Sequence, residues 1–503
     1  MSYKSFIGRA AIIVTLISLL SRLLGFVREI LFANYYGTNQ EYDKYLVASI
    51  IPLTINTISI FFYQNYFIPN YAKVKNENEG YEEGFTYKIF IRSILFSIII
   101  LFFLINFRKQ ILYLYTGKSF VDYQIELIFI YFSLTIFPSI ISSFFSAYLN
   151  IKNEFSVPSY SILSLNILTI LAIIYSNGEN IILISIGYLI GSILQLIFLV
   201  FKVDLSKITS GRYYAKNKLI KLSFNSFISV LLIESIGQLY SIADRYFYSE
   251  LDSGGIASLN YATSIYLLPV TIFTFSLSTV IMPKISELFA NKKIEEMNSI
   301  LDRVISLSIF FFIPIIILFT FWGEKIVRIF FERGSFSELS TKMTTDVLFY
   351  LSLSLVFYVV YGLLNKYLYS LRESFFLLVI TIMIIITKII FNYTLVGYYK
   401  QNGLAISTTI SYLLFFVLAF MKIKAKLDYK LNKKLFSDLM FYLFNTVLSS
   451  IIALILSSLI NVSNIFHDYL FIIIFFVIYF INNMILGEKN QMMILSQIRM
   501  MIK

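Results

Sequence analysis

Residues 374–396 read SFFLLVITIMIIITKIIFNYTLV, a run whose single charged residue is Lys388. Coiled as an α-helix with a rise of about 1.5 Å per residue, such a run crosses the roughly 30 Å hydrocarbon core of a bilayer. Similar runs recur along the 503 residues, which are 58% hydrophobic and 14% charged. These proportions exclude a soluble globular domain and predict an all-α polytopic membrane protein.

Hydropathy and the charges that bound the apolar runs predict about fourteen transmembrane helices. Their approximate ranges are 8–34, 43–68, 88–106, 123–148, 156–176, 180–201, 222–249, 255–283, 304–323, 343–365, 374–396, 403–421, 436–460 and 468–486. Most of the 41 Lys and Arg residues fall at the N-terminus, in the even-numbered loops and at the C-terminus. Because cytoplasmic segments carry the excess of positive charge, we expect both termini in the cytoplasm. Orientation and attraction to anionic lipid then account for the net charge of +12, so no nucleic-acid partner is expected.

An internal repeat organises the predicted helices. Three residues in and after the first span reappear with unchanged spacing in the second half of the chain: Arg28, Gly37 and Pro52 are matched by Arg245, Gly254 and Pro269. Six spans, an even number, separate the copies, so we expect two halves related by a pseudo-twofold axis along the membrane normal. The predicted division is a six-helix lobe at 1–210, a second six-helix lobe at 211–425, and two additional transmembrane helices with a short cytoplasmic tail at 426–503.

Ionisable side chains at membrane depth are the candidates for function, because a charge near the bilayer centre is costly unless it faces a cavity or a partner. In the first span, Arg22 and Arg28 flank Gly25. Arg22 is interpreted as a substrate-binding residue of a central cavity, the alternative being an ion pair with a neighbouring carboxylate. Arg28 is interpreted in the same way, the alternative being that it snorkels to the nearby outer interface. Both point into one cavity only if the helix bends at Gly25, which is therefore a predicted hinge.

The seventh span carries three further charged residues, Glu234, Asp244 and Arg245. Glu234 is nearly central and is the candidate proton or cation site, the alternative being a buried glutamate paired with a neighbouring helix. Arg245 is the repeat mate of Arg28, so both are expected at similar depth around a positive cavity mouth. Asp43 and Asp244 are expected to pair with these arginines in one conformation.

Lys388 is the remaining buried cation and a further candidate for the cavity. Arginine suits a pyrophosphate, because its planar fork donates two hydrogen bonds and keeps its charge. Catalytic patterns are nearly absent: the chain has no cysteine, and its one histidine, His467, supports neither a metal site nor a triad. Thr116-Gly117-Lys118-Ser119 resembles the end of a phosphate-binding loop, but Leu112 stands where the first glycine is required. We therefore expect no enzyme, no metal and no tightly bound cofactor, with transport driven by the membrane potential, Na⁺ or H⁺.

A run of nine residues and several later motifs carry a family resemblance. The run is Ser21-Arg22-Leu23-Leu24-Gly25-Phe26-Val27-Arg28-Glu29, followed by Tyr36-Gly37, Asp43 and Pro52. Later motifs in the same order are Leu149-Asn150, Asp244-Arg245-Tyr246-Phe247, Leu259-Asn260-Tyr261-Ala262, Glu332-Arg333-Gly334 and Gly403-Leu404-Ala405. Over about residues 5 to 425 the chain resembles the MurJ/MviN-type lipid II flippases of the multidrug/oligosaccharidyl-lipid/polysaccharide exporter superfamily.

This resemblance implies a two-lobed transporter whose central cationic cavity alternates between inward-open and outward-open states, with a groove for a prenyl tail formed by the last two spans. Arg22, Arg28 and Asp43 match cavity positions of the family. Family members also carry arginines in spans two and eight. The corresponding residues of this chain are Asn56 or Thr57 and Ser264, and the candidates to supply the missing charge are Arg245 and Lys388.

The predicted function is that of a flippase in the bacterial cytoplasmic membrane. It would translocate undecaprenyl-pyrophosphate-linked saccharide, with lipid II favoured, from the inner to the outer leaflet by alternating access. The alternative substrate is a capsule, exopolysaccharide or O-antigen type repeat unit, which the absent arginines favour. A cation-coupled multidrug exporter is less favoured, because fewer arginines and more carboxylates are expected in its cavity. Besides the lipid-linked saccharide and the bilayer, the partners suggested by pathway logic are cell-wall or polysaccharide synthesis enzymes.

Overall fold

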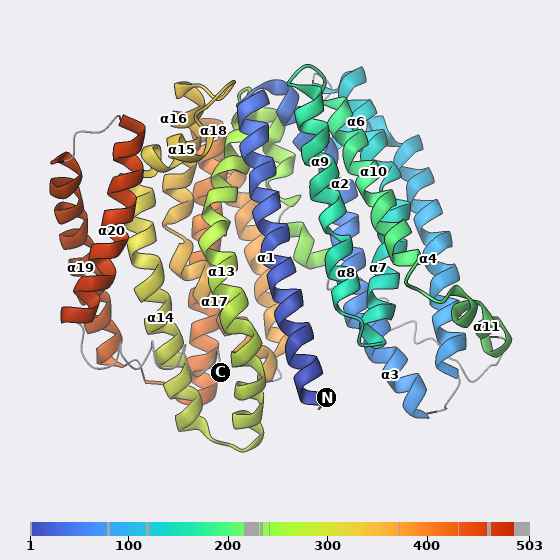
Figure 1. Ribbon diagram of the computed structural model, residues 1–503. Helices are drawn as coiled ribbons and strands as arrows, with labels where there is room; N and C mark the ends of the chain where they lie inside the picture. The colour runs from blue at the N-terminus through green and yellow to red at the C-terminus, as the bar shows by residue number, and fades with distance from the viewer. Residues whose placement is uncertain are drawn as a thin grey trace. The chain divides into compact units, whose positions relative to one another are not determined.

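The computed structural model describes residues 3–77, 81–116, 120–215, 231, 235–240, 242–371, 373–430, 432–459 and 464–486. They are mostly helical (Figure 1) and form two compact units. Unit 1 comprises Met1–Tyr261, Arg333–Ser340 and Thr381–Leu404, and unit 2 comprises Ala262–Glu332, Thr341–Ile380 and Ala405–Lys503. The lobe boundaries expected at residues 210 and 425 stay predictions.

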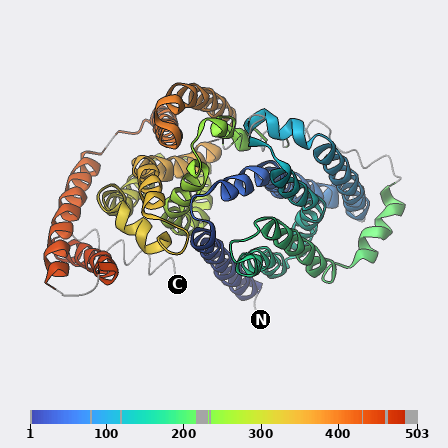
Figure 2. The same cartoon turned by 90° about the horizontal axis from the view of Figure 1, so that it is seen from above.

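Unit 1 is built from the N-terminal helices, which are seen end-on in Figure 2. The helices are α1 (Tyr3–Tyr36), α2 (Gln40–Phe62), the π-helical turn η1 (Tyr63–Phe67), α3 (Ile68–Glu77), α4 (Tyr81–Asn106), α5 (Arg108–Thr116), α6 (Tyr123–Leu134), α7 (Ile136–Ile151), α8 (Ser156–Ser161), α9 (Leu163–Ser176), α10 (Ile182–Val200), α11 (Leu205–Ala215) and the 3-10 turn η3 (Arg245–Glu250). Within this unit α9 packs along α10, and α11 packs against α4.

Two long helices of the second half of the chain, α13 (Gly255–Ala290) and α18 (Ser374–Leu427), have residues in both units. The described helices of that half are α13 (Gly255–Ala290), α14 (Ile294–Phe321), α15 (Gly323–Phe331), α16 (Glu338–Ser352), α17 (Leu355–Ser370), α18 (Ser374–Leu427), α19 (Lys433–Ser458) and α20 (Asn464–Leu486). The 54 residues of α18 form two helices joined at Lys400, whose φ of 49° and ψ of −129° are not helical. In unit 2, α14 packs against α19, which packs against α20.

The membrane-spanning character of the helices confirms the polytopic all-α prediction. Among the described residues, nine helical segments are long and apolar enough to cross a membrane, or ten if α16 and α17, bent by 48°, form one span. Helices α1 and α13 cover the predicted spans 8–34 and 255–283, and α18 covers two predicted spans. The predicted span 222–249 lies largely outside the described residues. Every other predicted span coincides with one helix or a broken pair of helices.

Local sequence explains several helix boundaries. The Asn39 side chain accepts a hydrogen bond of 2.9 Å from the Tyr42 amide and caps α2, while Asp122 accepts one of 3.0 Å from the Ile125 amide and caps α6. These oxygens satisfy amides that have no partner inside the helix. The predicted span 123–148 is broken into α6 and α7, because Pro138 lacks an N–H and its ring clashes with the carbonyl four residues earlier, at the last residue of α6.

Candidate functional site

The buried carboxylate of Glu29 is the centre of a polar network that joins α1, α2 and α13. Arg28 Nη2 lies 2.9 Å from Glu29 Oε1. The other carboxylate oxygen, Oε2, accepts hydrogen bonds from the Tyr42 hydroxyl at 2.6 Å and from Asn260 Nδ2 at 2.7 Å. Tyr42 and Asn260 are neutral donors, so Arg28 compensates the charge of the carboxylate. The structure thus places Arg28 beside Glu29. Glu29 belongs to the nine-residue motif that carries the family resemblance, but it was not a predicted site residue.

Asp43 connects α2 to the beginning of α13. Its side chain is buried, and its two oxygens accept hydrogen bonds from the backbone amides of Gly254, at 2.6 Å, and Ala257, at 2.7 Å. The first amides of a helix lack intrahelical partners and lie at the positive end of the helix dipole, so a carboxylate is stabilised there. In this structure Asp43 is therefore a helix cap, and its expected pairing with Arg28 or Arg245 stays a prediction for another conformation.

Two glycines matched by the repeat share an unusual backbone conformation. Gly37 has a φ of +54° and Gly254 a φ of +82°, in the region that favours glycine. A Cβ atom on Gly37 would lie 2.3 Å from the carbonyl oxygen of Ser335, and one on Gly254 would lie 2.2 Å from that of Thr38. Within unit 1 the two glycines therefore allow close backbone packing around the segment that follows α1.

The buried Lys388 and the partly exposed Asp244 form a second charge pair in unit 1. Lys388 Nζ lies 2.9 Å from Asp244 Oδ2, and Asn392 donates to Asp244 Oδ1 at 2.9 Å. The ammonium group also lies 3.9 Å from the centre of the Tyr240 ring, within range of a cation–π interaction. Lys388 is 1% exposed. The structure thus brings together two residues that the sequence singled out separately, and it commits Lys388 to Asp244.

Of the other predicted residues, Arg245 directly follows Asp244, and Glu234 lies outside the described residues. Arg22 is exposed on α1, and α1 continues without a break through Gly25. Arg245 begins η3 and is half-buried. The cavity role of Arg22, Arg28, Asp43, Arg245 and Lys388, the hinge at Gly25 and the ion-coupling role of Glu234 and Asp244 stay predictions.

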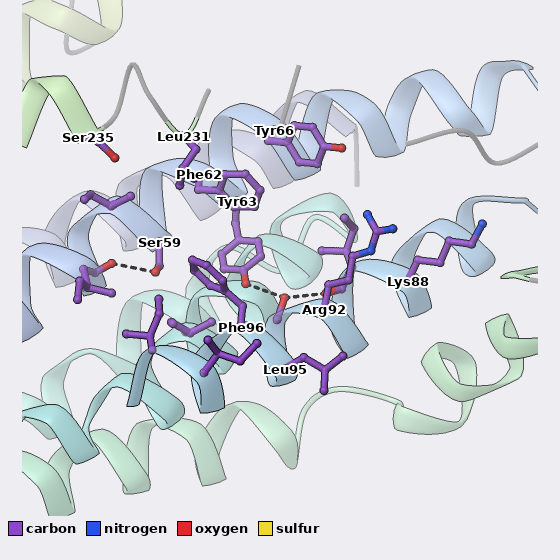
Figure 3. Close-up of a pocket in the computed structure, with 17 residues that line it drawn as sticks. Ser59, Phe62, Tyr63, Tyr66, Lys88, Arg92, Leu95, Phe96, Leu231 and Ser235 are labelled. Atoms are coloured by element: carbon purple, nitrogen blue, oxygen red, sulfur yellow. Dashed lines mark hydrogen bonds between the residues drawn. The ribbon is translucent and has the colours of Figure 1, made fainter. Parts of the chain in front are cut away.

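A cavity of about 730 Å³ lies in unit 1 between α2, η1, α4 and α7. Its walls are mainly apolar, and two cations, Lys88 and Arg92, line it from the first half of α4 (Figure 3). Neither cation was a predicted site residue, because membrane orientation explains basic residues near the end of a predicted span. Their spacing of four residues does predict that both side chains lie on the same face of the helix.

Comparison with known proteins places this chain in a transporter family. A family model described as "Lipid II flippase MurJ" matches residues 32–481. A protein of Borreliella burgdorferi named "Probable lipid II flippase MurJ" is 28% identical over 413 residues, which are 80% of this chain and 81% of that protein. The "Lipid II flippase MurJ" of Thermosipho africanus is 28% identical over 421 residues, covering 81% of this chain and 85% of that protein.

Solved structures show the same fold. The structure titled "Lipid II flippase MurJ, inward closed conformation" matches with a TM-score of 0.79 at 23% identity, covering 96% of this chain and 100% of that one. An inward-facing multidrug resistance transporter of the MATE family matches with a TM-score of 0.64 at 12% identity, covering 83% of this chain and 98% of that one. The family model extends over most of the described helices, and this chain therefore belongs to the lipid II flippase MurJ family.

Proposed function

We propose that this protein is a lipid II flippase that carries the lipid-linked precursor from the inner to the outer leaflet of the bacterial cytoplasmic membrane. The observation that carries the proposal is the family match over residues 32–481, on a chain built of membrane-spanning helices. Its likeness to multidrug transporters is one of fold, at 12% identity, and supports no drug substrate. A lipid-linked saccharide of capsule, exopolysaccharide or O-antigen type is disfavoured as the substrate, because the matching family model is described as a lipid II flippase.

Arg28 and the polar network around Glu29 are the proposed machinery for the pyrophosphate. The Arg28 side chain is 28% exposed, although its guanidinium pairs with Glu29. A pyrophosphate presents the same anionic acceptor geometry as a carboxylate, so it competes with Glu29 for the planar donor fork of Arg28. Arg22, exposed on the same helix, adds attraction for the approaching anion.

The hydrogen bonds of Asp43 to Gly254 and Ala257 are the proposed latch of one conformation. They hold the start of α13 against α2 within unit 1. A buried carboxylate with strong backbone partners favours one discrete arrangement, and alternating access requires that such contacts form in one state and break in another.

The proposed energy source is the membrane potential or a Na⁺ or H⁺ gradient, without an enzymatic step. Both termini are proposed to face the cytoplasm, and synthesis enzymes of the cell wall are proposed partners.

The deciding experiment is complementation of a bacterial strain depleted of its own lipid II flippase. We expect the wild-type chain to restore growth and Arg28→Ala to abolish rescue at equal membrane abundance, because the proposed phosphate fork is lost. The matched control is Arg108→Ala, since Arg108 also pairs with a glutamate, Glu126, and is 33% exposed. Arg108→Ala should rescue. No rescue by well-inserted wild-type protein, measured alongside lipid II appearance in the outer leaflet, would contradict the proposed substrate.

A further inference from the structure

The basic-ended cavity of unit 1, lined by Lys88 and Arg92, is not used by the mechanism proposed above. Lys88 and Arg92 are one turn apart on α4, so their charges lie on one face of the helix. Two cations on one face of a helix raise the local positive potential, and this potential attracts an anion. Lys88 is half-buried and Arg92 is exposed, so the pair is accessible from outside the protein. This end of the cavity is therefore suited to an anionic group.

The rest of the cavity is suited to hydrocarbon. Its apolar wall is formed by side chains of α2, α4 and α7, among them Ile58, Phe62, Ile100 and Ile140. Two of the polar groups that reach the wall, on Tyr63 and Ser93, already have partners. The Tyr63 hydroxyl donates to Ser93 Oγ at 2.7 Å, and Ser93 Oγ donates to a backbone carbonyl at 2.7 Å (Figure 3). Since these two hydroxyls need no further partner, a chain of methylene groups fits beside them without leaving either one unsatisfied.

The predicted depth of the two cations in the membrane matches the depth at which lipid headgroups lie. Lys88 and Arg92 are near the beginning of the predicted span 88–106, at the end that the charge bias places toward the cytoplasm. Basic pockets between transmembrane helices on that side bind the phosphates of lipid headgroups. In contrast, residues that serve only to orient a span need no apolar cavity beside them.

We propose that this cavity binds a phosphate-bearing lipid from the inner leaflet, with its phosphate between Lys88 and Arg92 and its hydrocarbon chain along α2 and α4. Two lipids share this chemistry: an anionic phospholipid and a polyprenyl pyrophosphate. The phospholipid case stands independently of lipid II transport. The polyprenyl case rests on the proposed function and makes the cavity a second binding position for the lipid end of the substrate.

The test measures lipids bound to the purified full-length protein by native mass spectrometry. Phosphatidylglycerol or zwitterionic phosphatidylcholine is added at equal concentration. Wild-type protein is expected to prefer phosphatidylglycerol. Lys88→Gln combined with Arg92→Gln should weaken that binding roughly 30-fold, the product of two near-surface cation contributions. The control, Lys109→Gln with Lys342→Gln, removes the same charge from two exposed positions at the predicted outer side and should leave binding unchanged. Equal binding of both lipids by the wild type, or equal loss in both double variants, would overturn the proposal.

A second pair of variants tests the apolar part while keeping both cations. Ile100→Trp fills the cavity and should reduce phosphatidylglycerol binding, whereas Phe102→Trp, at a side chain that is 67% exposed, should not. Unchanged binding in Ile100→Trp would contradict a lipid chain in the cavity. Undecaprenyl pyrophosphate then distinguishes the sources: displacement of phosphatidylglycerol assigns the site to substrate lipid as well, and no displacement assigns it to phospholipid. Because binding is measured without transport, its result is separate from that of complementation.

Discussion

Two ion-paired regions of this protein have the same chemistry but different surroundings. In unit 1, Lys388 is 1% exposed and pairs with Asp244 at 2.9 Å. In unit 2, Glu373 precedes α18 and meets Lys422 at 3.2 Å and Lys426 at 3.0 Å, with lysine side chains 33% and 46% exposed. The two groups differ in their cations, because water and salt screen the exposed lysines of the second group, whereas the ammonium group of Lys388 is shielded from both. We therefore expect the contribution of each ion pair to the free energy of unfolding to depend on the burial of its charges and not on the number of partners.

The largest effect is expected from breaking the buried pair. Lys388→Met leaves the carboxylate of Asp244 without its cation and should destabilise the folded protein by about 3 kcal/mol, the lower end of the range for a buried pair, because the Asp244 side chain is 22% exposed. A large fall in melting temperature in detergent measures it. The double variant Lys388→Met with Asp244→Asn removes both charges and should recover much of the loss. If the single and double variants melted together, the pair would not be the source of the effect.

An intermediate effect is expected at Asp43, a buried carboxylate whose described partners are backbone amides and not a cation. Asp43→Ala leaves the amides of Gly254 and Ala257 without these acceptors and should destabilise by about 1–3 kcal/mol. Asp43→Asn keeps one acceptor oxygen and should lose less, because asparagine caps helices well. The measurement is the melting temperature of each variant, compared with that of the wild-type protein. Equal loss in both would mean that the negative charge, and not the hydrogen bonding, is what α13 requires.

The smallest effect is expected at Glu373. The hydrogen bonds of Lys426 and Lys422 lower the pKa of this carboxyl group. A carboxyl whose pKa is lowered by folding contributes stability above its ordinary pKa, and this contribution is lost as the pH falls through the folded-state pKa. Glu373→Gln should therefore change the melting temperature slightly at neutral pH and not at all in acid. A large loss that persists in acid would show that the surface group behaves like the buried pair.

Much of the candidate site was visible in the sequence as single residues, but not as pairs. Arg28, Asp244 and Lys388 stood out because charges are rare in apolar runs. Their partners did not follow, since 144 residues separate Lys388 from Asp244 and no periodicity connects them. Lys88 and Arg92 were missed for a different reason: membrane orientation already explained basic residues at the end of a span.

Composition, hydropathy and repeated spacings are sufficient to predict a polytopic helical membrane protein with a duplicated pattern, and short motifs carry the family resemblance. The reason is that the bilayer requires every spanning segment to satisfy its own backbone hydrogen bonds, so length and hydropathy suffice to predict the helices. Three features are visible only in the tertiary structure: Asp43 caps α13, Lys388 pairs with Asp244, and two cations of α4 line an apolar cavity. These features depend on which helices pack together, and packing brings distant residues within a few ångströms by shape and by charge that no local pattern records.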